Sequence, residues 1–182
     1  MVAGIVGLGG WLWDDLTGQP AVYVVGDSIT SLSQAAISAA LIQAGYRPTV
    51  SATPGAKIGQ AVTNVATLAE HPPWAWVIQL GTDDAGARNG SWPQPFLAEW
   101  AEISPAACVI YVTVSPRAGP IATQIDSSME RLAEAHANVH VLDWGQVEYE
   151  NPTWVSPDGI HPTSAGQSEL AGLEVRDLLR VC

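Results

Sequence analysis

The sequence predicts an α/β domain with three layers, in which a five-stranded parallel sheet lies between two layers of helices. Short apolar runs recur roughly every 30 residues, and a segment of helical length follows each of them. Each run is apolar almost throughout, as expected of strands that helices cover on both faces. Strict alternation of strand and helix within 182 residues favours a single domain with a parallel sheet.

The predicted strands and helices alternate along the whole chain from residue 21 onward. The predicted strands are residues 21–25, 49–52, 76–80, 108–114 and 139–142. The predicted helices are residues 28–44, which end at Gly45, then 58–69, 94–102, one helix within 118–137, and 164–181. Five such strands suit the flavodoxin-like order 2-1-3-4-5, with functional groups beyond the carboxyl ends of the strands.

The N-terminal part is predicted to lie outside this domain. Residues 1–13 are apolar, rich in glycine and without charge, and residues 14–20 have the composition of a linker. A signal peptide would begin with basic residues, and none precede this apolar run. Two interpretations stay open, an extra packed segment or the trailing half of a signal or anchor helix. We therefore divide the chain into a segment 1–20 and a domain 21–182.

The charge of the chain argues against two classes of partner. Lys and Arg number 7 and Asp and Glu number 18, which gives a net charge of −11. A chain with this negative charge is poorly suited to bind phosphate backbones or anionic lipid. We therefore expect no nucleic-acid partner. Membrane attachment is expected only through a segment preceding the N-terminal run.

The two cysteines permit one disulfide. Cys108 begins a predicted strand and Cys182 ends the last predicted helix. Because helices run antiparallel to the strands in this architecture, both residues are expected at the same edge of the sheet. A Cys108–Cys182 bridge would favour an oxidising compartment, whereas two free thiols are the alternative.

Polar and glycine-rich clusters follow four of the strands. Ser28 follows the first strand, and Asp158 and His161 precede the last helix. A serine hydroxyl needs a base to accept its proton, and that base needs a group that fixes its tautomer. Taken singly, Ser28 could be a helix cap, Asp158 a turn residue and His161 a residue at a helix start. Together they predict a serine nucleophile, a base and an orienting carboxylate.

These motifs resemble those of the SGNH (GDSL-type) hydrolase superfamily, which contains esterases and lipases. The similarity covers about residues 21–181 and lies in GDSIT at 26–30, PGAKIG at 54–59, LGTDD at 80–84 and DGIHPT at 158–163. The resemblance implies that Ser28 is the nucleophile, His161 the base and Asp158 the orienting carboxylate. It also implies an oxyanion hole formed by the N–H of Ser28, a glycine N–H and an asparagine side chain. The glycine is Gly55, with Gly59 as the alternative.

The third motif departs from the family pattern, because Asp83 stands where the family has asparagine. An ionised carboxylate accepts hydrogen bonds and donates none, so it would repel a developing oxyanion. Three interpretations are open: a buried, protonated Asp83 that still donates, a slow enzyme with two backbone donors, or an altered or degenerate site. Asp84 is expected to be structural, tying the loop after the third strand through backbone N–H groups.

The sequence thus predicts a serine ester hydrolase that needs no metal and no organic cofactor. Asp27, Asp83 and Asp84 make a poor magnesium site, because no lysine follows at the end of a later strand. The expected substrate is a small or exposed ester, or a glycan ester, and Trp154 and Ile160 are predicted to contact it. For Trp154, simple packing is the alternative.

Two alternatives remain for the activity. An acyltransferase would use the same three residues, and a silent envelope protein would keep the fold and bind a glycan or a partner. We expect a monomer located outside the cell or in its envelope.

Overall fold

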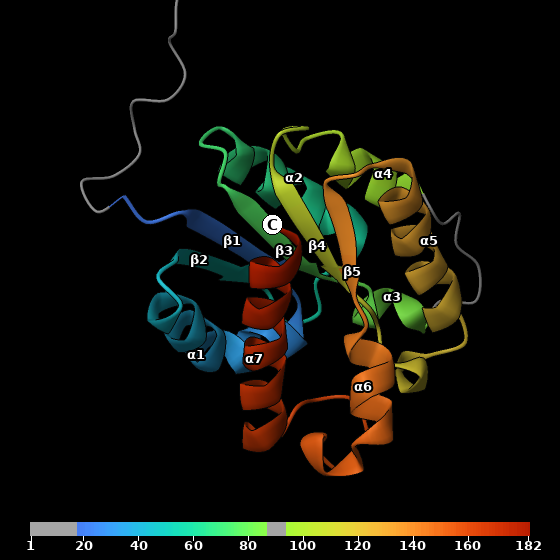
Figure 1. Ribbon diagram of the computed structural model, residues 1–182. Helices are drawn as coiled ribbons and strands as arrows, with labels where there is room; N and C mark the ends of the chain where they lie inside the picture. Colours follow the sequence, from blue (N-terminus) through green and yellow to red (C-terminus); the bar gives the residue numbers. More distant parts are fainter. Residues whose placement is uncertain (1–17, 87–93) are drawn as a thin grey trace, which may run out of the picture.

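The computed structural model describes residues 18–86 and 94–182, and these form a five-stranded parallel sheet between helices (Figure 1). Its strand order is β2-β1-β3-β4-β5 and all four pairings are parallel, so the predicted topology is confirmed. The strands are β1 (Ala21–Gly26), β2 (Arg47–Ala52), β3 (Ala75–Gln79), β4 (Cys108–Val112) and β5 (Val139–Leu142).

Helices cover both faces of the sheet. One face carries α1 (Ser28–Gln43), α6 (Trp144–Glu150) and α7 (Ser164–Val181), and Figure 1 shows α1 and α7 side by side. The other face carries α2 (Ile58–Ala69), α4 (Gln94–Trp100) and α5 (Ala122–Ala135). None of the helices in the described part of the chain is long and apolar enough to cross a bilayer.

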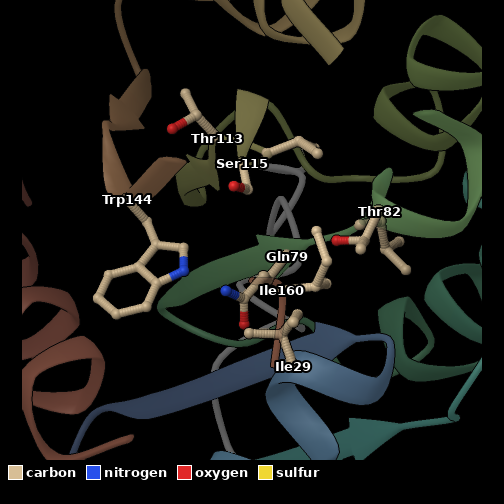
Figure 2. A pocket seen from close by; sticks show the side chains of 9 residues that line it. Ile29, Gln79, Thr82, Thr113, Ser115, Trp144 and Ile160 are labelled. Atoms are coloured by element: carbon tan, nitrogen blue, oxygen red, sulfur yellow. The ribbon is translucent and has the colours of Figure 1, made fainter. Parts of the chain in front are cut away.

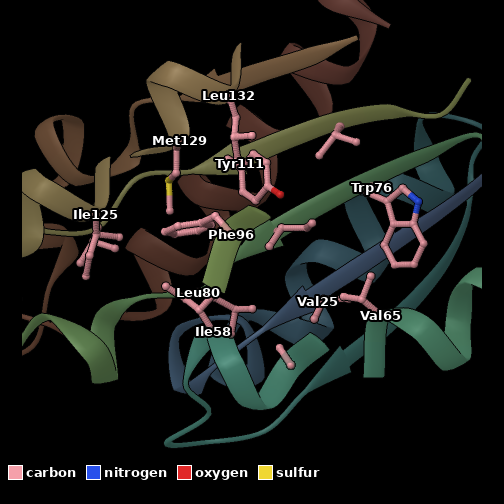
Figure 3. Close-up of a cluster of buried hydrophobic side chains, with 14 of the residues drawn as sticks. Val25, Ile58, Val65, Trp76, Leu80, Phe96, Tyr111, Ile125, Met129 and Leu132 are labelled. Carbon is pink, nitrogen blue, oxygen red and sulfur yellow. The ribbon is translucent and has the colours of Figure 1, made fainter. Parts of the chain in front are cut away.

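The strands have two apolar faces because each face meets its own helical layer. In β1, Val22 and Val24 point to the layer of α1 and α7, whereas Val25 points to the opposite layer. Figure 3 shows this opposite core, where Trp76 and Tyr111 are fully buried. Burial of one large apolar side chain contributes about 1.5–3 kcal/mol, so the two cores hold the strand ends in fixed positions.

Most predicted boundaries agree with the structure, and the differences have local causes. Strand β2 begins at Arg47, two residues earlier than predicted, and it includes Pro48. Proline is tolerated there because β2 is an edge strand of the sheet. Four short elements were not predicted: α3 (Thr82–Ala85), α6, and two 3-10 turns, η1 (Pro116–Ala118) and η2 (Pro152–Trp154). Residues 1–17 lie outside the described residues, so the prediction for the N-terminal segment stays a prediction.

A disulfide joins Cys108, at the start of β4, to Cys182, at the end of α7. The alternative of two free thiols is therefore wrong. The bridge lies at the edge where the strands begin. The carboxyl ends of the strands lie at the opposite edge, and the loops that carry the polar clusters meet there.

Candidate active site

Ser28 is the first residue of α1, directly beyond the end of β1. The residue that caps this helix is Asp27, whose Oδ1 accepts a hydrogen bond from the Ile29 N–H at 2.9 Å. The interpretation of Ser28 as the helix cap is therefore wrong, and its hydroxyl is available for another partner. Gly26 permits the close approach of Thr30, since a Cβ there would overlap the Thr30 hydroxyl.

Asp158 and His161 lie in the turn between η2 and α7. Asp158 Oδ1 accepts hydrogen bonds from the N–H groups of Ile160 and His161, at 2.9 and 3.0 Å, and from the Ser156 hydroxyl at 2.9 Å. The Ile160 N–H is the largest of the effects that hold the pKa of Asp158 well below its usual range, and the His161 side chain follows. Asp158 is thus a turn residue and a fixed carboxylate at the same time.

The structure brings Ser28, His161 and Asp158 into one hydrogen-bonded line. Ser28 Oγ lies 3.0 Å from His161 Nε2, and His161 Nδ1 lies 2.8 Å from Asp158 Oδ2. An ionised carboxylate can only accept, so Nδ1 carries a proton and Nε2 of the neutral ring faces the hydroxyl as an acceptor. The side chains of His161 and Asp158 are 39% and 50% exposed, so a substrate can reach them. This arrangement can remove the proton from Ser28 as its oxygen attacks an electrophile.

Two backbone N–H groups, those of the predicted oxyanion donors Ser28 and Gly55, have no acceptor among the described residues. Gly55 has φ +79° in the turn between β2 and α2, where Ala56 N–H donates to the Thr53 carbonyl at 3.0 Å. The N–H groups of Ser28 and Gly55 donate no hydrogen bond to any other residue that the structure describes. Gly59, the alternative to Gly55, lies in the first turn of α2. Unpaired N–H groups at a helix start and in a tight turn are typical oxyanion donors.

Asp83 is exposed in α3, just beyond β3. The interpretation that burial keeps Asp83 protonated is therefore wrong, because its side chain lies in solvent. Its neighbour Asp84 is buried, and Asp84 Oδ2 accepts from the Ile58 N–H at 3.0 Å. Asp84 binds a backbone N–H as expected, and this N–H belongs to Ile58, the first residue of α2. Asp84 therefore connects α3 to α2, the helix that follows the Gly55 turn.

Asp27 is a second carboxyl group, directly before Ser28 in the sequence. Its pKa is raised to about 6, mainly because the carboxyl group is buried; the Ile29 N–H opposes the rise and the charge of Asp83 adds to it. The charge of Asp83 thus acts on the pKa of Asp27, the residue directly before Ser28.

A small pocket lies beside the residues that adjoin Ser28 and His161 in the sequence (Figure 2). It has room for about one water molecule. Ile29, the neighbour of Ser28, and Ile160, the neighbour of His161, both line it. The lining residues are Ile29, Gln79, Leu80, Thr82, Thr113, Val114, Ser115, Trp144 and Ile160.

Of the two residues predicted to contact the substrate, Ile160 lines this pocket and Trp154 does not. Trp154 stacks on Trp144 with ring centroids 6.3 Å apart, so it supports the tryptophan that does line the pocket. The sequence analysis did not identify Trp144 as a pocket residue. The available signal was its position two residues after β5, at the edge of the sheet where the strands end.

Among residues 18–86 and 94–182, no group of three or more His, Cys, Asp or Glu side chains is placed to hold a metal ion.

Comparisons with known proteins show similarity in part of the sequence and in the fold. A scan against protein-family models finds no match. In sequence, the chain is 27% identical over 126 residues to a protein of Bacillus subtilis (strain 168) named as a candidate peptidoglycan O-acetyltransferase, YrhL. The match includes 66% of this chain and 19% of that protein, so the chain spans about a fifth of the relative's length.

Solved structures are similar over most of the chain, at low sequence identity. The family 3 carbohydrate esterase of Clostridium thermocellum has a TM-score of 0.70 and 18% identity, and the match covers 89% of this chain and 98% of that one. The C-terminal catalytic domain of peptidoglycan O-acetyltransferase A from Streptococcus pneumoniae has a TM-score of 0.69 and 18% identity, covering 90% and 92%. A lipolytic G-D-S-L family protein from Veillonella parvula has a TM-score of 0.72 and 16% identity, covering 88% and 98%.

Proposed function

Because the chain has the fold of the SGNH (GDSL-type) hydrolases, we propose that it is a serine enzyme that cleaves an ester through an acyl-enzyme at Ser28. The observation that carries the proposal is the hydrogen-bonded line from Ser28 through His161 to Asp158, with distances of 3.0 and 2.8 Å. A serine or histidine with only a structural role would not need to be hydrogen-bonded in the order Ser28, His161, Asp158 at the edge of the sheet where the strands end.

The proposed reaction has two halves. His161 Nε2 takes the proton of Ser28 as Oγ attacks the ester carbonyl carbon, and the carbonyl oxygen becomes an oxyanion. The N–H groups of Ser28 and Gly55 stabilise this oxyanion. The tetrahedral intermediate then expels the alcohol, which receives the proton from His161. A second hydroxyl compound, activated by His161 in the same way, attacks the acyl-enzyme and releases Ser28.

The pocket beside Ser28 supports a short acyl group. Its space for about one water molecule is close to the size of a methyl group, and Trp144 and Ile160 restrict it. We therefore propose an acetyl ester, carried by a small alcohol or by an exposed glycan. The low charge of the pocket, which contains no ionisable side chain, suits a neutral acyl group.

A second candidate function differs only in the acceptor. If water attacks the acyl-enzyme, the protein is an esterase; if a sugar hydroxyl attacks, it is an acetyltransferase. The names of the Bacillus relative and of the Streptococcus domain favour the transferase, whereas the carbohydrate esterase favours hydrolysis. In both cases a glycan of the cell envelope is the proposed partner. The disulfide supports a location outside the cytoplasm.

The test measures turnover of p-nitrophenyl acetate, butyrate and octanoate by the wild type and by Ser28→Ala. We expect acetate to be turned over fastest, and Ser28→Ala to lose at least about 100-fold in kcat, since a nucleophile that acts within a triad contributes several orders of magnitude. Mass spectrometry after treatment with phenylmethylsulfonyl fluoride should place the adduct on Ser28. Equal rates for the two proteins would refute an enzyme of this type and favour the silent envelope protein.

A second assay separates the two acceptors. Adding a chitooligosaccharide to the acetate reaction should give an acetylated sugar if the protein is a transferase, at the expense of free acetate. Release of acetate alone, with no acetylated sugar in the mass spectrum, would identify an esterase.

A further inference from the structure

The turn that carries Asp158 and His161 is held together almost entirely from within. Residues 155 and 162 pair as an antiparallel bridge, and Ser156 N–H donates to the His161 carbonyl at 2.8 Å. Every hydrogen bond of the Asp158 carboxylate described above comes from residues 156–161. The carboxylate and the base are therefore fixed relative to each other. Their position relative to Ser28 depends on how this turn packs against the rest of the domain.

Arg117 packs against the tip of this turn. A Cβ added to Gly159 would lie 3.1 Å from Arg117 Cδ and 4.0 Å from its Nε, so the arginine stem lies directly against the glycine. Gly159 has φ +74°, and it lies between Asp158 and the Ile160 N–H that binds the carboxylate. Arg117 comes from η1, in the segment that follows β4 of the sheet.

The guanidinium of Arg117 is held on its other side by α6. Its Nη2 donates to the Tyr149 carbonyl at 3.2 Å, and its Cζ lies 4.4 Å from the centre of the Tyr149 ring. Its Nη1 lies 4.0 Å from Oε1 of Glu148, a fully buried carboxyl group. Burial raises the pKa of Glu148, and the Arg117 charge opposes this. These contacts fix the head group, so the stem is held in place beside Gly159.

We propose that Arg117 is a positioning residue that sets the distance between His161 and Ser28 by packing its stem against Gly159. The charge of Arg117 is directed to Glu148 and Tyr149, so the stem, and not the charge, acts on the turn. The inference rests on the proposed function for its kinetic effect. A misplacement of about 1 Å can lower a rate about 100-fold, so a change in this packing should reduce kcat and leave KM nearly unchanged.

The kinetic test compares Arg117→Ala with Arg117→Lys. Lysine keeps the methylene stem and a positive charge near Glu148 but loses the guanidinium that stacks on Tyr149, so its kcat should fall by less than about fivefold. Alanine removes the stem, and kcat should fall about 10- to 100-fold with KM within about twofold. The double variant Arg117→Ala/Glu148→Gln should show the same loss of kcat without an unpaired buried carboxylate. Arg176→Ala, an exposed arginine on α7, is the matched control and should behave as the wild type.

A second readout does not depend on turnover. Amide exchange of Ile160 and His161, whose N–H groups bind Asp158, should accelerate in Arg117→Ala and not in Arg176→Ala or Arg117→Lys. Three results for Arg117→Ala would overturn the proposal. They are a wild-type kcat, a change in KM alone, and unchanged amide exchange rates at Ile160 and His161. If no variant and no wild type turns over an ester, the proposed function fails, and the exchange rates still decide the role of Arg117.

Discussion

The replacement Asp83→Asn tests the position at which the sequence departs from the family pattern that it resembles. Asp83 lies exposed in α3, directly after β3, and its charge raises the pKa of Asp27 beside the nucleophile. The change converts one carboxylate oxygen to an NH₂ group of nearly the same size. It removes a negative charge and adds a hydrogen-bond donor at the position where the resemblance implies the third group of the oxyanion hole.

The expected effect on kcat is large. One oxyanion donor contributes a factor of about 10²–10³, or roughly 3–4 kcal/mol of transition-state stabilisation. In the proposed wild-type site, the N–H groups of Ser28 and Gly55 are the two donors to the oxyanion. Asp83→Asn should therefore raise kcat for p-nitrophenyl acetate about 100-fold. Folding stability should change by less than about 0.5 kcal/mol, because the exposed side chain takes no part in the core.

Initial rates over a range of p-nitrophenyl acetate concentrations give kcat and KM, with Ser28→Ala as the blank. Glu134→Gln is the matched control, since it removes the same charge from an exposed position near the end of α5, at the opposite edge of the sheet. A wild-type kcat in Asp83→Asn would show that this side chain does not reach the oxyanion. A lower kcat would show that the carboxylate assists the reaction, which contradicts the oxyanion argument.

Three further predictions concern stability. Gly26→Ala should destabilise the fold by about 1–3 kcal/mol, because its Cβ would overlap the Thr30 hydroxyl, and an unchanged denaturation midpoint would contradict the close approach. Glu174 is fully buried without a hydrogen-bond partner among the described residues, and burial raises its pKa from 4.5 to about 8. Between pH 4.5 and about 8 the folded state keeps a proton on Glu174 that the unfolded state loses. The free energy of unfolding should therefore fall as pH rises, by up to about 1.4 kcal/mol per pH unit. Denaturation curves of Glu174→Gln should show a weaker dependence on pH. Cys182→Ser removes a cross-link between residues 74 positions apart. The free energy of unfolding should fall by about 4 kcal/mol, because the unfolded chain gains entropy. An unchanged melting temperature would show that the bridge constrains the unfolded chain little.

The fold could be predicted from the sequence because its strongest determinants are local. Strands buried on both faces are apolar along their whole length, and α2 and α7 begin and end at the predicted residues. The parallel arrangement then follows from alternation, and it places the ends of the strands at one edge. This is why residues as distant in sequence as Ser28 and His161 could be assigned to one site.

The parts that could not be predicted depend on contacts between distant segments. Trp144 lines the pocket because α6 turns back over the end of β4, where Gly145 N–H donates to the Thr113 hydroxyl at 2.9 Å. Nothing in the seven residues of α6 indicates that approach. Arg117 was not singled out, since one arginine after a strand carries no pattern. The exposure of Asp83 was equally invisible, because a short turn such as α3 does not reveal which side faces solvent.

The location of Asp83 explains how the site can depart from the family pattern while the fold is kept. The two cores and the disulfide fix the sheet and the helices, and none of them includes the Asp83 side chain. The neighbouring Asp84 ties α3 to α2 instead, through the Ile58 N–H. A carboxylate at position 83 therefore costs little in folding, and its effect falls on the reaction. Selection on stability would not remove it, so a kinetic measurement is the one that reveals its consequence.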